Sequence, residues 1–375
     1  MKSAIILLAG NSIAVAFSYL VAAPFCIAVD LPQPPKPQPQ TIDQNAQGRA
    51  DNLLTSGNQK FRNRDYFGAL ADYSAAIKLS PKFEKAFYNR GVTYDRLGDR
   101  AKAVEDYTQL ITLNPRNAYG YFNRGVNRER LGDKQGAFTD LSQAIEIDPN
   151  YLDAYLNRGI LRDELGDLKG ADADFSQAIR IKPTEPDAYL NRGWIRYKLA
   201  DKKGAIDDYS QAIKVDPKYY LAYNNRAWTK ADMGDVKGAM ADYDQSIKLN
   251  PKYYLSYYNR ANTRRGFGDY AGAIADYNST IEIKPDYAYA YNNRGLAQRR
   301  LKQIPAAMAD FNLAIKFNPN LAEAYFNRGF AHITLNNRAS AAKDFQTAAK
   351  LYQQQGYKKE AKNALKLAKE NTAQL

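Results

Sequence analysis

Charged side chains with the spacing of ion pairs are the first chemical feature of this sequence. In a pattern that recurs along the chain, nine Asp residues stand directly before a bulky apolar residue and eight Arg residues stand directly before a Gly or Ala. The carboxylates are Asp72, Asp106, Asp140, Asp174, Asp208, Asp242, Asp276, Asp310 and Asp344, and the guanidinium groups are Arg90, Arg124, Arg158, Arg192, Arg226, Arg260, Arg294 and Arg328. A guanidinium and a carboxylate can form two parallel hydrogen bonds, which adds geometric specificity.

We predict that each Arg pairs with the Asp of the preceding copy of this pattern. The first copy has Ser56 where the others have Arg, and it has no predecessor, so the pairs would be of the type Asp72–Arg90. The last carboxylate, Asp344, would then pair with Lys362. Such a ladder would set the register between neighbouring copies, with separately solvated charges as the alternative.

Residues for catalysis or metal binding are scarce. His332 is the only histidine and Cys26 the only cysteine, so no familiar zinc site or His-activated nucleophile can be assembled. No glycine-rich phosphate loop occurs. Asn278 begins a glycosylation-type triplet, but the triplet falls inside a predicted helix. We therefore expect no catalytic residue, no cofactor and no metal, and a protein that is not an enzyme.

The elements that position the charges follow from a repeat of constant length. Eight prolines are each separated by 34 residues: Pro81, Pro115, Pro149, Pro183, Pro217, Pro251, Pro285 and Pro319. A fixed period of this length indicates one supersecondary unit copied along the chain. Nine such units fill residues 49–355.

Each unit is predicted to be an antiparallel pair of helices. In residues 84–117, small and apolar side chains recur at steps of three and four in two stretches, which places each stretch on one helical stripe. Gly98 suits the end of the first helix, and Asp99 suits the N-cap of the second. Pro115 ends the second helix because it lacks an amide hydrogen. Only a neighbouring pair can cover the remaining apolar surface.

With these features the chain resembles the tetratricopeptide repeat (TPR) family. Units two to nine carry an aromatic residue where this family often has Trp: Phe87, Tyr121, Tyr155, Tyr189, Tyr223, Tyr257, Tyr291 and Tyr325. The resemblance implies an all-α fold, a right-handed α-solenoid (superhelix) of nine helix-turn-helix repeats. We expect residues 356–375 to form a C-terminal capping helix and tail, with Ala361, Ala364, Leu365 and Ala368 facing inward.

The resemblance also implies a concave groove, lined by the first helices, that binds an extended segment of a partner protein. An Asn precedes each Arg: Asn89, Asn123, Asn157, Asn191, Asn225, Asn259, Asn293 and Asn327. In some members of the family, Asn side chains at this place hold the backbone of a bound peptide. A structural role in joining helices is equally compatible with the pattern.

Two rows of first-helix residues would face this groove. One row is Val92, Val126, Ile160, Trp194, Trp228, Asn262, Leu296 and Phe330, and the other is Tyr88, Phe122, Leu156, Leu190, Asn224, Tyr258, Asn292 and Phe326. The next turn adds Arg264, Arg265, Arg299 and Arg300 in units seven and eight, against Asp163 and Glu164 in unit four. A partner with apolar anchors near the two Trp residues and acidic residues toward the C-terminal side would fit. Burial of these rows by curvature of the array is the alternative.

The net charge leaves a second function class open. The formal charge is +13 at pH 7, which allows binding of an anionic polymer or membrane through charge. A Lys-rich solvated surface explains the same number, and we do not expect nucleic acid as a partner. The leading expectation is a non-enzymatic interaction or assembly scaffold of unidentified partner and oligomeric state.

The N-terminus predicts export. Lys2 precedes a charge-free, largely apolar stretch, and small residues near Ala28 suit signal cleavage, so residues 1–28 are interpreted as a signal peptide or, alternatively, a membrane anchor. Residues 29–48 form a Pro-rich linker. The expected location is the periplasm or another extracytoplasmic compartment, or the membrane surface if the segment is retained.

Overall fold

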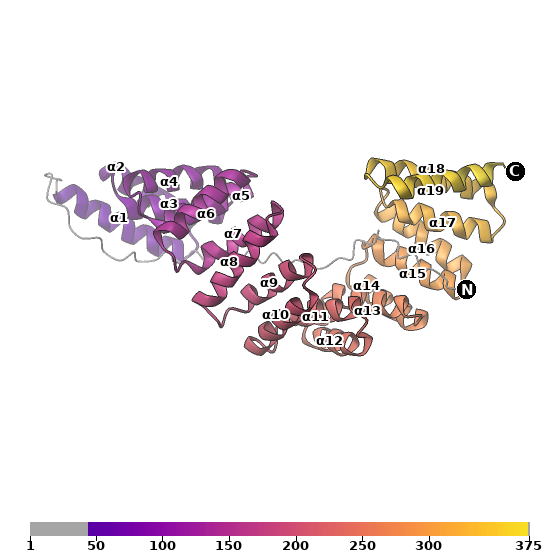
Figure 1. Ribbon diagram of the computed structural model, residues 1–375. Coiled ribbons are helices and arrows are strands. Elements are labelled where there is room, and N and C mark those ends of the chain that lie inside the picture. Colours follow the sequence, from indigo (N-terminus) through magenta and orange to yellow (C-terminus); the bar gives the residue numbers. More distant parts are fainter. Residues whose placement is uncertain (1–43, 374–375) are drawn as a thin grey trace. The chain divides into compact units, whose positions relative to one another are not determined.

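The computed structural model describes residues 44–373, and every regular element in that range is an α-helix. The predicted signal segment and most of the linker lie outside the described residues. The described chain divides into two compact units, one ending at Asp201 and the other beginning at Lys202. The all-helical solenoid predicted from the sequence is confirmed, and antiparallel helix pairs recur within each unit (Figure 1).

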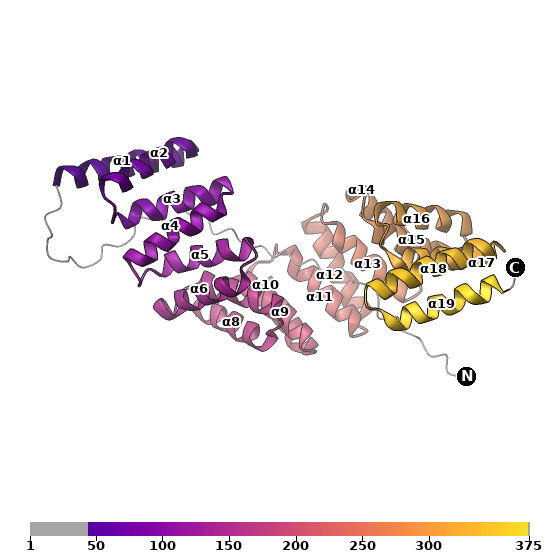
Figure 2. The ribbon, with the colours of Figure 1, turned by 90° about the horizontal axis from the view of Figure 1, so that it is seen from above.

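The first unit contains nine helices in its described part. They are α1 (Gln44–Arg62), α2 (Tyr66–Leu79), α3 (Glu84–Leu97), α4 (Arg100–Leu113), α5 (Ala118–Arg130), α6 (Lys134–Ile147), α7 (Leu152–Glu164), α8 (Leu168–Ile181) and α9 (Pro186–Lys198). Each helix contacts the next, and α1 contacts α3 while α7 contacts α9. The first helices α1 and α3 (both labelled in Figure 2), and likewise α7 and α9, are therefore neighbours.

The second unit continues the same arrangement. Its helices are α10 (Lys202–Val215), α11 (Tyr220–Asp232), α12 (Val236–Leu249), α13 (Tyr254–Gly266), α14 (Tyr270–Ile283), α15 (Ala288–Arg300), α16 (Ile304–Phe317), α17 (Ala322–Thr334), α18 (Arg338–Gln354) and α19 (Lys358–Thr372). Contacts join α11 to α13, α13 to α15 and α15 to α17. First helices again lie beside one another.

The turn inside each repeat contains one left-handed residue, and in most repeats a capping side chain begins the second helix, with Gln303 before α16 as an exception. Asp133 caps α6 by accepting a hydrogen bond from the Gly136 amide at 2.8 Å, which satisfies one of the free amides at a helix start. The residue two positions before the second helix takes positive φ, for example 83° at Gly98. The same conformation occurs without Gly at Arg64, Ala200, Lys302 and Asn336. The turn is thus imposed by packing even where the residue opposes it.

The core of each repeat is built from a buried Ala and a buried bulky side chain of the second helix against a small residue of the first; the bulky side chain is Leu141 in the third repeat and a ring in the others. Ala103 and Tyr107 of α4 have no exposed surface. A Cβ on Gly91 would stand 2.9 Å from the Tyr107 ring, so a larger side chain there would force the two helices apart. The small residue of the first helix therefore permits the close approach of the two helices.

The capping helix differs from the prediction in one respect. Ala364 and Ala368 of α19 are fully buried, but Leu365 is 46% exposed. Leu367 instead packs against Ala341 and Phe345 of α18. Leu365 lies one position past Ala364 and therefore points about 100° away from it on the helix. Between residues 44 and 373, no helix has both the length and the apolar character needed to cross a membrane.

Candidate functional site

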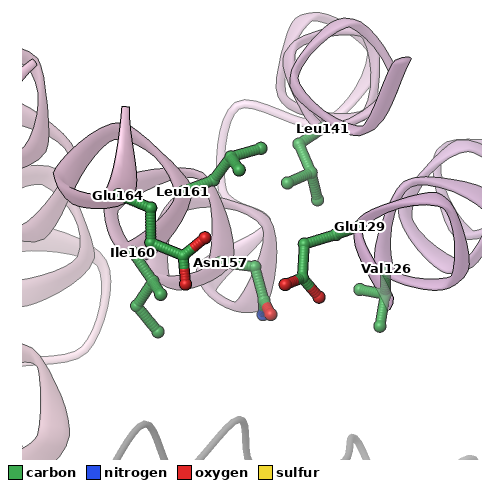
Figure 3. A pocket seen from close by; sticks show the side chains of 7 residues that line it. All are labelled: Val126, Glu129, Leu141, Asn157, Ile160, Leu161 and Glu164. Carbon is green, nitrogen blue, oxygen red and sulfur yellow. The ribbon is translucent and has the colours of Figure 1, made fainter. Parts of the chain in front are cut away.

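A hollow of about 140 Å³ opens between first helices of two successive repeats in the first unit. It is lined by Val126 and Glu129 of α5, Leu141 of α6, and Asn157, Ile160, Leu161 and Glu164 of α7. Figure 3 shows the carboxylates of Glu129 and Glu164 directed into the same space, with the Asn157 amide between them in this view. The hollow thus combines an apolar wall with two acidic groups.

The surroundings of Glu129 in this hollow disfavour its ionised carboxylate. Burial raises the pKa of Glu129, and the neighbouring carboxylate of Glu164 raises it further. Arg130, Lys134 and Arg100 oppose this shift without forming an ion pair with Glu129 among the described residues. Glu164 pairs with Lys134 at 3.0 Å. Glu129 was not singled out from the sequence, although it stands at the same position of its repeat as Asp163, Arg265 and Arg299.

The row that contains the two Trp residues is partly accessible. Val92 and Val126 are buried, whereas Ile160, Trp194, Trp228, Asn262, Leu296 and Phe330 are half-buried. In the first unit, Trp194 packs with Phe175 and Ile195 and stacks on Tyr197 at 5.8 Å between ring centroids. In the second unit, Trp228 packs against Tyr243. Each Trp therefore has one face in the core.

The second predicted row is largely internal, which corrects its assignment to the groove. Tyr88, Phe122, Leu190, Asn224, Tyr258 and Asn292 are buried, while Leu156 and Phe326 are half-buried. Tyr258 is 1% exposed and accepts a hydrogen bond from Asn293 at 3.0 Å. The row is closed because the neighbouring first helices pack against it, which is the alternative that the sequence left open.

Five of the eight Asn residues are also internal, and Asn89, Asn259 and Asn293 among them join neighbouring first helices. Asn89, Asn123, Asn225, Asn259 and Asn293 are at most 6% exposed. Asn89 donates to Asn58 at 2.7 Å and Asn259 donates to Asn224 at 3.2 Å, in each case on the preceding first helix. Asn157, Asn191 and Asn327 are half-buried. Of these, Asn327 donates to Asn292 at 2.9 Å, so Asn157 and Asn191 are the ones for which partner contact stays a prediction.

The Arg residues predicted to favour acidic partner groups have different environments. Arg300 is exposed, whereas Arg265 and Arg299 are half-buried. The Arg265 Nε donates to the Tyr277 hydroxyl at 3.3 Å, and the Arg299 guanidinium lies 5.5 Å from the centre of the Phe330 ring. Burial lowers the pKa of Arg299, and Arg300 lowers it further. Contact of these groups with a partner remains a prediction.

The Arg/Asp ladder exists, but the predicted pairing between repeats is wrong. Arg90 bonds Asp106 of its own repeat through Nε at 2.9 Å and Nη2 at 2.7 Å. The same two-bond pair joins Arg124–Asp140, Arg158–Asp174, Arg226–Asp242, Arg260–Asp276, Arg294–Asp310 and Arg328–Asp344. The antiparallel turn brings residues 16 apart on the two helices of one repeat side by side.

The ends of the array show the same correction. Asp72 accepts from Ser56 at 2.7 Å and pairs with Lys60 at 2.7 Å, both in the first repeat. Asp344 pairs with Arg328 and Lys362 is exposed. Ser56 therefore bonds the Asp of its own repeat, as the Arg at the same position does in later repeats.

The contact between repeats comes from a third donor of the same guanidinium. The Arg90 Nη1 donates to Ser74 Oγ at 3.1 Å, on the second helix of the preceding repeat. Equivalent bonds reach Thr108, Ser142, Ser176, Ser210, Asp244, Asn278 and Asn312. Arg90 also lies 5.7 Å from the Phe87 ring centre, and the equivalent aromatic of each later repeat underlies its Arg in the same way. The Arg thus joins two repeats, but through a position that the sequence analysis missed.

The remaining titratable residue singled out from the sequence is structural. His332 lies on α17 with Nε2 3.7 Å from the Asp344 carboxylate, and burial lowers its pKa. Within residues 44–373, no cluster of His, Cys, Asp and Glu has the makings of a metal site.

Family models place the chain among known repeat proteins. Models described as tetratricopeptide repeat match residues 84–117, 118–151, 152–185, 186–219, 220–253, 242–275, 288–321 and 322–352, and a model described as TPR repeat matches residues 57–98 and 267–302. No curated protein sequence matches the chain.

Solved structures agree in fold. A tetratricopeptide repeat protein from Parabacteroides merdae is 22% identical with a TM-score of 0.54, covering 67% of this chain and 98% of that one. The C-terminal part of a TPR repeat-containing protein from Cytophaga hutchinsonii is 18% identical with a TM-score of 0.54, covering 64% and 98%. Yeast Tom70 is 15% identical with a TM-score of 0.50, covering 89% and 97%. The helix pairs, their 34-residue period and the family matches agree: this chain belongs to the tetratricopeptide repeat family.

Proposed function

We propose that this protein is a non-enzymatic scaffold that binds an extended segment of a partner protein along its first helices. The observation that carries the proposal is the hollow between α5 and α7, where side chains of two successive first helices leave space that the chain itself does not fill. Half-buried Ile160 and Trp194 lie on the same row of first helices in this unit. Such side chains stabilise the repeat with one face and offer the other to a partner.

The experiment is a selection of binding peptides from a random phage-displayed library on the purified full-length protein. Binders should emerge from the wild type, and the Trp194→Ala/Trp228→Ala variant should bind them at least tenfold more weakly, because truncation of a Trp anchor removes a large contact area. Phe67→Ala is the matched control, since Phe67 is 77% exposed on a second helix. Circular dichroism confirms that each variant is folded.

Two outcomes would overturn this function. If no peptide binds, or if the Phe67 variant loses as much affinity as the Trp variant, the first helices are not the binding face. Binding that collapses as salt is raised would instead support the basic-surface function, because contacts between exposed charges are screened.

We also propose that the protein acts outside the cytoplasm after export through residues 1–28. The support is the sequence pattern of that segment. Mass spectrometry of the protein isolated from its native cell should give a chain that begins at Val29. A full-length chain that sediments with membranes would replace export with anchoring.

A further inference from the structure

Ion pairs with a spacing of 35 residues join neighbouring first helices in the first unit. Asp95 of α3 pairs with Arg130 of α5 at 3.3 Å, and Asp163 of α7 pairs with Lys198 of α9. In both pairs an acidic residue of one repeat faces the basic residue one place further along the next first helix. The position is therefore a charge-matched contact between successive repeats.

The junction between these two breaks the rule. The residues at the same two positions are Glu129 of α5 and Glu164 of α7, so two carboxylates stand where an acid and a base are expected. Both line the hollow described above, and Figure 3 shows them directed into its common space. Two carboxylates facing one space repel each other unless a cation or a proton lies near them.

The cations of the protein itself compensate only one of the two. Lys134 of α6 reaches Glu164 at 3.0 Å while its own side chain is 45% exposed. In the part of the chain that the structure describes, no Lys or Arg forms an ion pair with Glu129. The raised pKa of Glu129 follows from this burial beside a second carboxylate, against the weaker influence of Arg130, Lys134 and Arg100.

The wall of the hollow suits the stem of a long basic side chain. Val126 and Leu141 are buried on one side, and Ile160 and Leu161 line the other. The Asn157 amide donates to the Asp153 carbonyl at 2.7 Å, which leaves its carbonyl oxygen as a further acceptor. Lys and Arg bury an apolar stem while keeping the charged end near polar groups.

We infer that this hollow binds a Lys or Arg side chain of the partner's extended segment, with the charged end between Glu129 and Glu164 and the stem against Val126 and Ile160. We call these four residues with Asn157 the carboxylate slot. The inference rests on the proposed function, because the basic side chain is presented by the segment bound along the first helices. Charge complementarity at one place fixes the register of such a segment.

The peptide selection is the test, repeated with Glu129→Gln/Glu164→Gln and with Glu146→Gln, all as full-length protein. Glu146 is an exposed carboxylate on α6 and makes a matched control for charge. Peptides selected on the wild type and on the control should share a Lys or Arg at one position. Peptides selected on the double variant should have no shared basic position. Replacing that residue by norleucine should weaken binding about tenfold, because a charge-assisted hydrogen bond is lost.

The outcomes separate the slot from the function. Peptides that bind but show no basic position, or that keep it on the double variant, overturn the slot and leave the scaffold function standing. Absence of any binder overturns the function.

If no peptide binds, a second measurement tests whether the carboxylate slot binds a basic group. The Glu129 carboxyl is followed by ¹³C NMR on the full-length protein with n-butylammonium chloride, and Glu129→Gln identifies the signal. The slot predicts that butylammonium lowers the Glu129 pKa, whereas equal concentrations of sodium chloride do not. Equal effects of the two salts, or an equal effect of calcium chloride, would overturn it in favour of general screening or a divalent-ion site.

Discussion

Arg90 and Asp106 lie on the two helices of one repeat and are joined by two hydrogen bonds, while the third donor of the same guanidinium bonds Ser74 of the repeat before. One side chain therefore closes a helix pair and attaches it to its neighbour. In the seven two-bond pairs described above, the Asp side chains are only 2–8% exposed. A buried carboxylate without its cation is strongly destabilising.

The cost of losing this Arg should depend on whether a second cation is present. Asp310 has Arg294 as its ion-pair partner in the described chain, whereas Asp140 has both Arg124 and Arg128. Arg294→Leu should lower the free energy of unfolding by about 3–5 kcal/mol, and Arg124→Leu by clearly less. Urea denaturation followed by circular dichroism measures both. Equal losses would show that the lost packing of the Arg stem outweighs the charge.

The left-handed turn residues predict stabilising substitutions. Ala200 and Lys302 have φ of 66° and 61°, a conformation that costs a residue with a Cβ roughly 1–2 kcal/mol. Ala200→Gly and Lys302→Gly should each gain up to about 1 kcal/mol, after the entropy that Gly loses on folding is subtracted. The reverse change, Gly98→Ala, should destabilise. Thermal unfolding reports all three, and a loss of stability in both Gly variants would contradict the account.

The internal Asn residues predict a stability effect rather than a binding effect. Asn293 is 2% exposed and donates to both Tyr258 and Asn262 on the preceding first helix. Asn293→Ala should cost about 1–3 kcal/mol, because buried acceptors lose their donor. Asn157→Ala should cost less, since Asn157 is half-buried and its amide bonds its own helix. Denaturant midpoints that rank the two variants in the opposite order would reject the structural role.

Replacing Glu129 by Gln should stabilise the protein in a pH-dependent way. Its folded-state pKa is raised, first by burial and then by Glu164, so the folded protein disfavours the ionised form. Glu129→Gln removes that penalty and should raise the melting temperature at pH 7. The corresponding gain in the free energy of unfolding should be less than about 1 kcal/mol, because the group is partly solvated.

The gain should disappear below the unfolded-state pKa, near pH 4, where wild-type Glu129 is protonated in both states. A gain that is the same at pH 7 and at pH 3.5 would mean that the substitution acts by something other than charge.

Periodicity alone predicted most of the fold. A 34-residue interval between prolines, together with apolar and small residues at steps of three and four within each interval, specifies a helix pair. It also specifies the stacking of the pairs, because each pair has apolar surface that only another pair can cover. The turn chemistry at Gly98 and Asp99 is equally local. The inward face of the C-terminal helix was harder to predict, as the exposed Leu365 shows. A single helix without further repeats gives too short a pattern to fix which face turns inward.

Partners across space were beyond the reach of the pattern. Every Arg of the ladder is 18 residues after one ladder Asp and 16 before another, so the sequence permits both pairings. Only the way the two antiparallel helices meet selects Asp106 over Asp72 for Arg90. Burial of Tyr258 and Asn293 likewise depends on how closely successive first helices approach. Glu129 faces Glu164 because those helices pack in that register, which explains why a site that breaks the repeat emerged only in three dimensions.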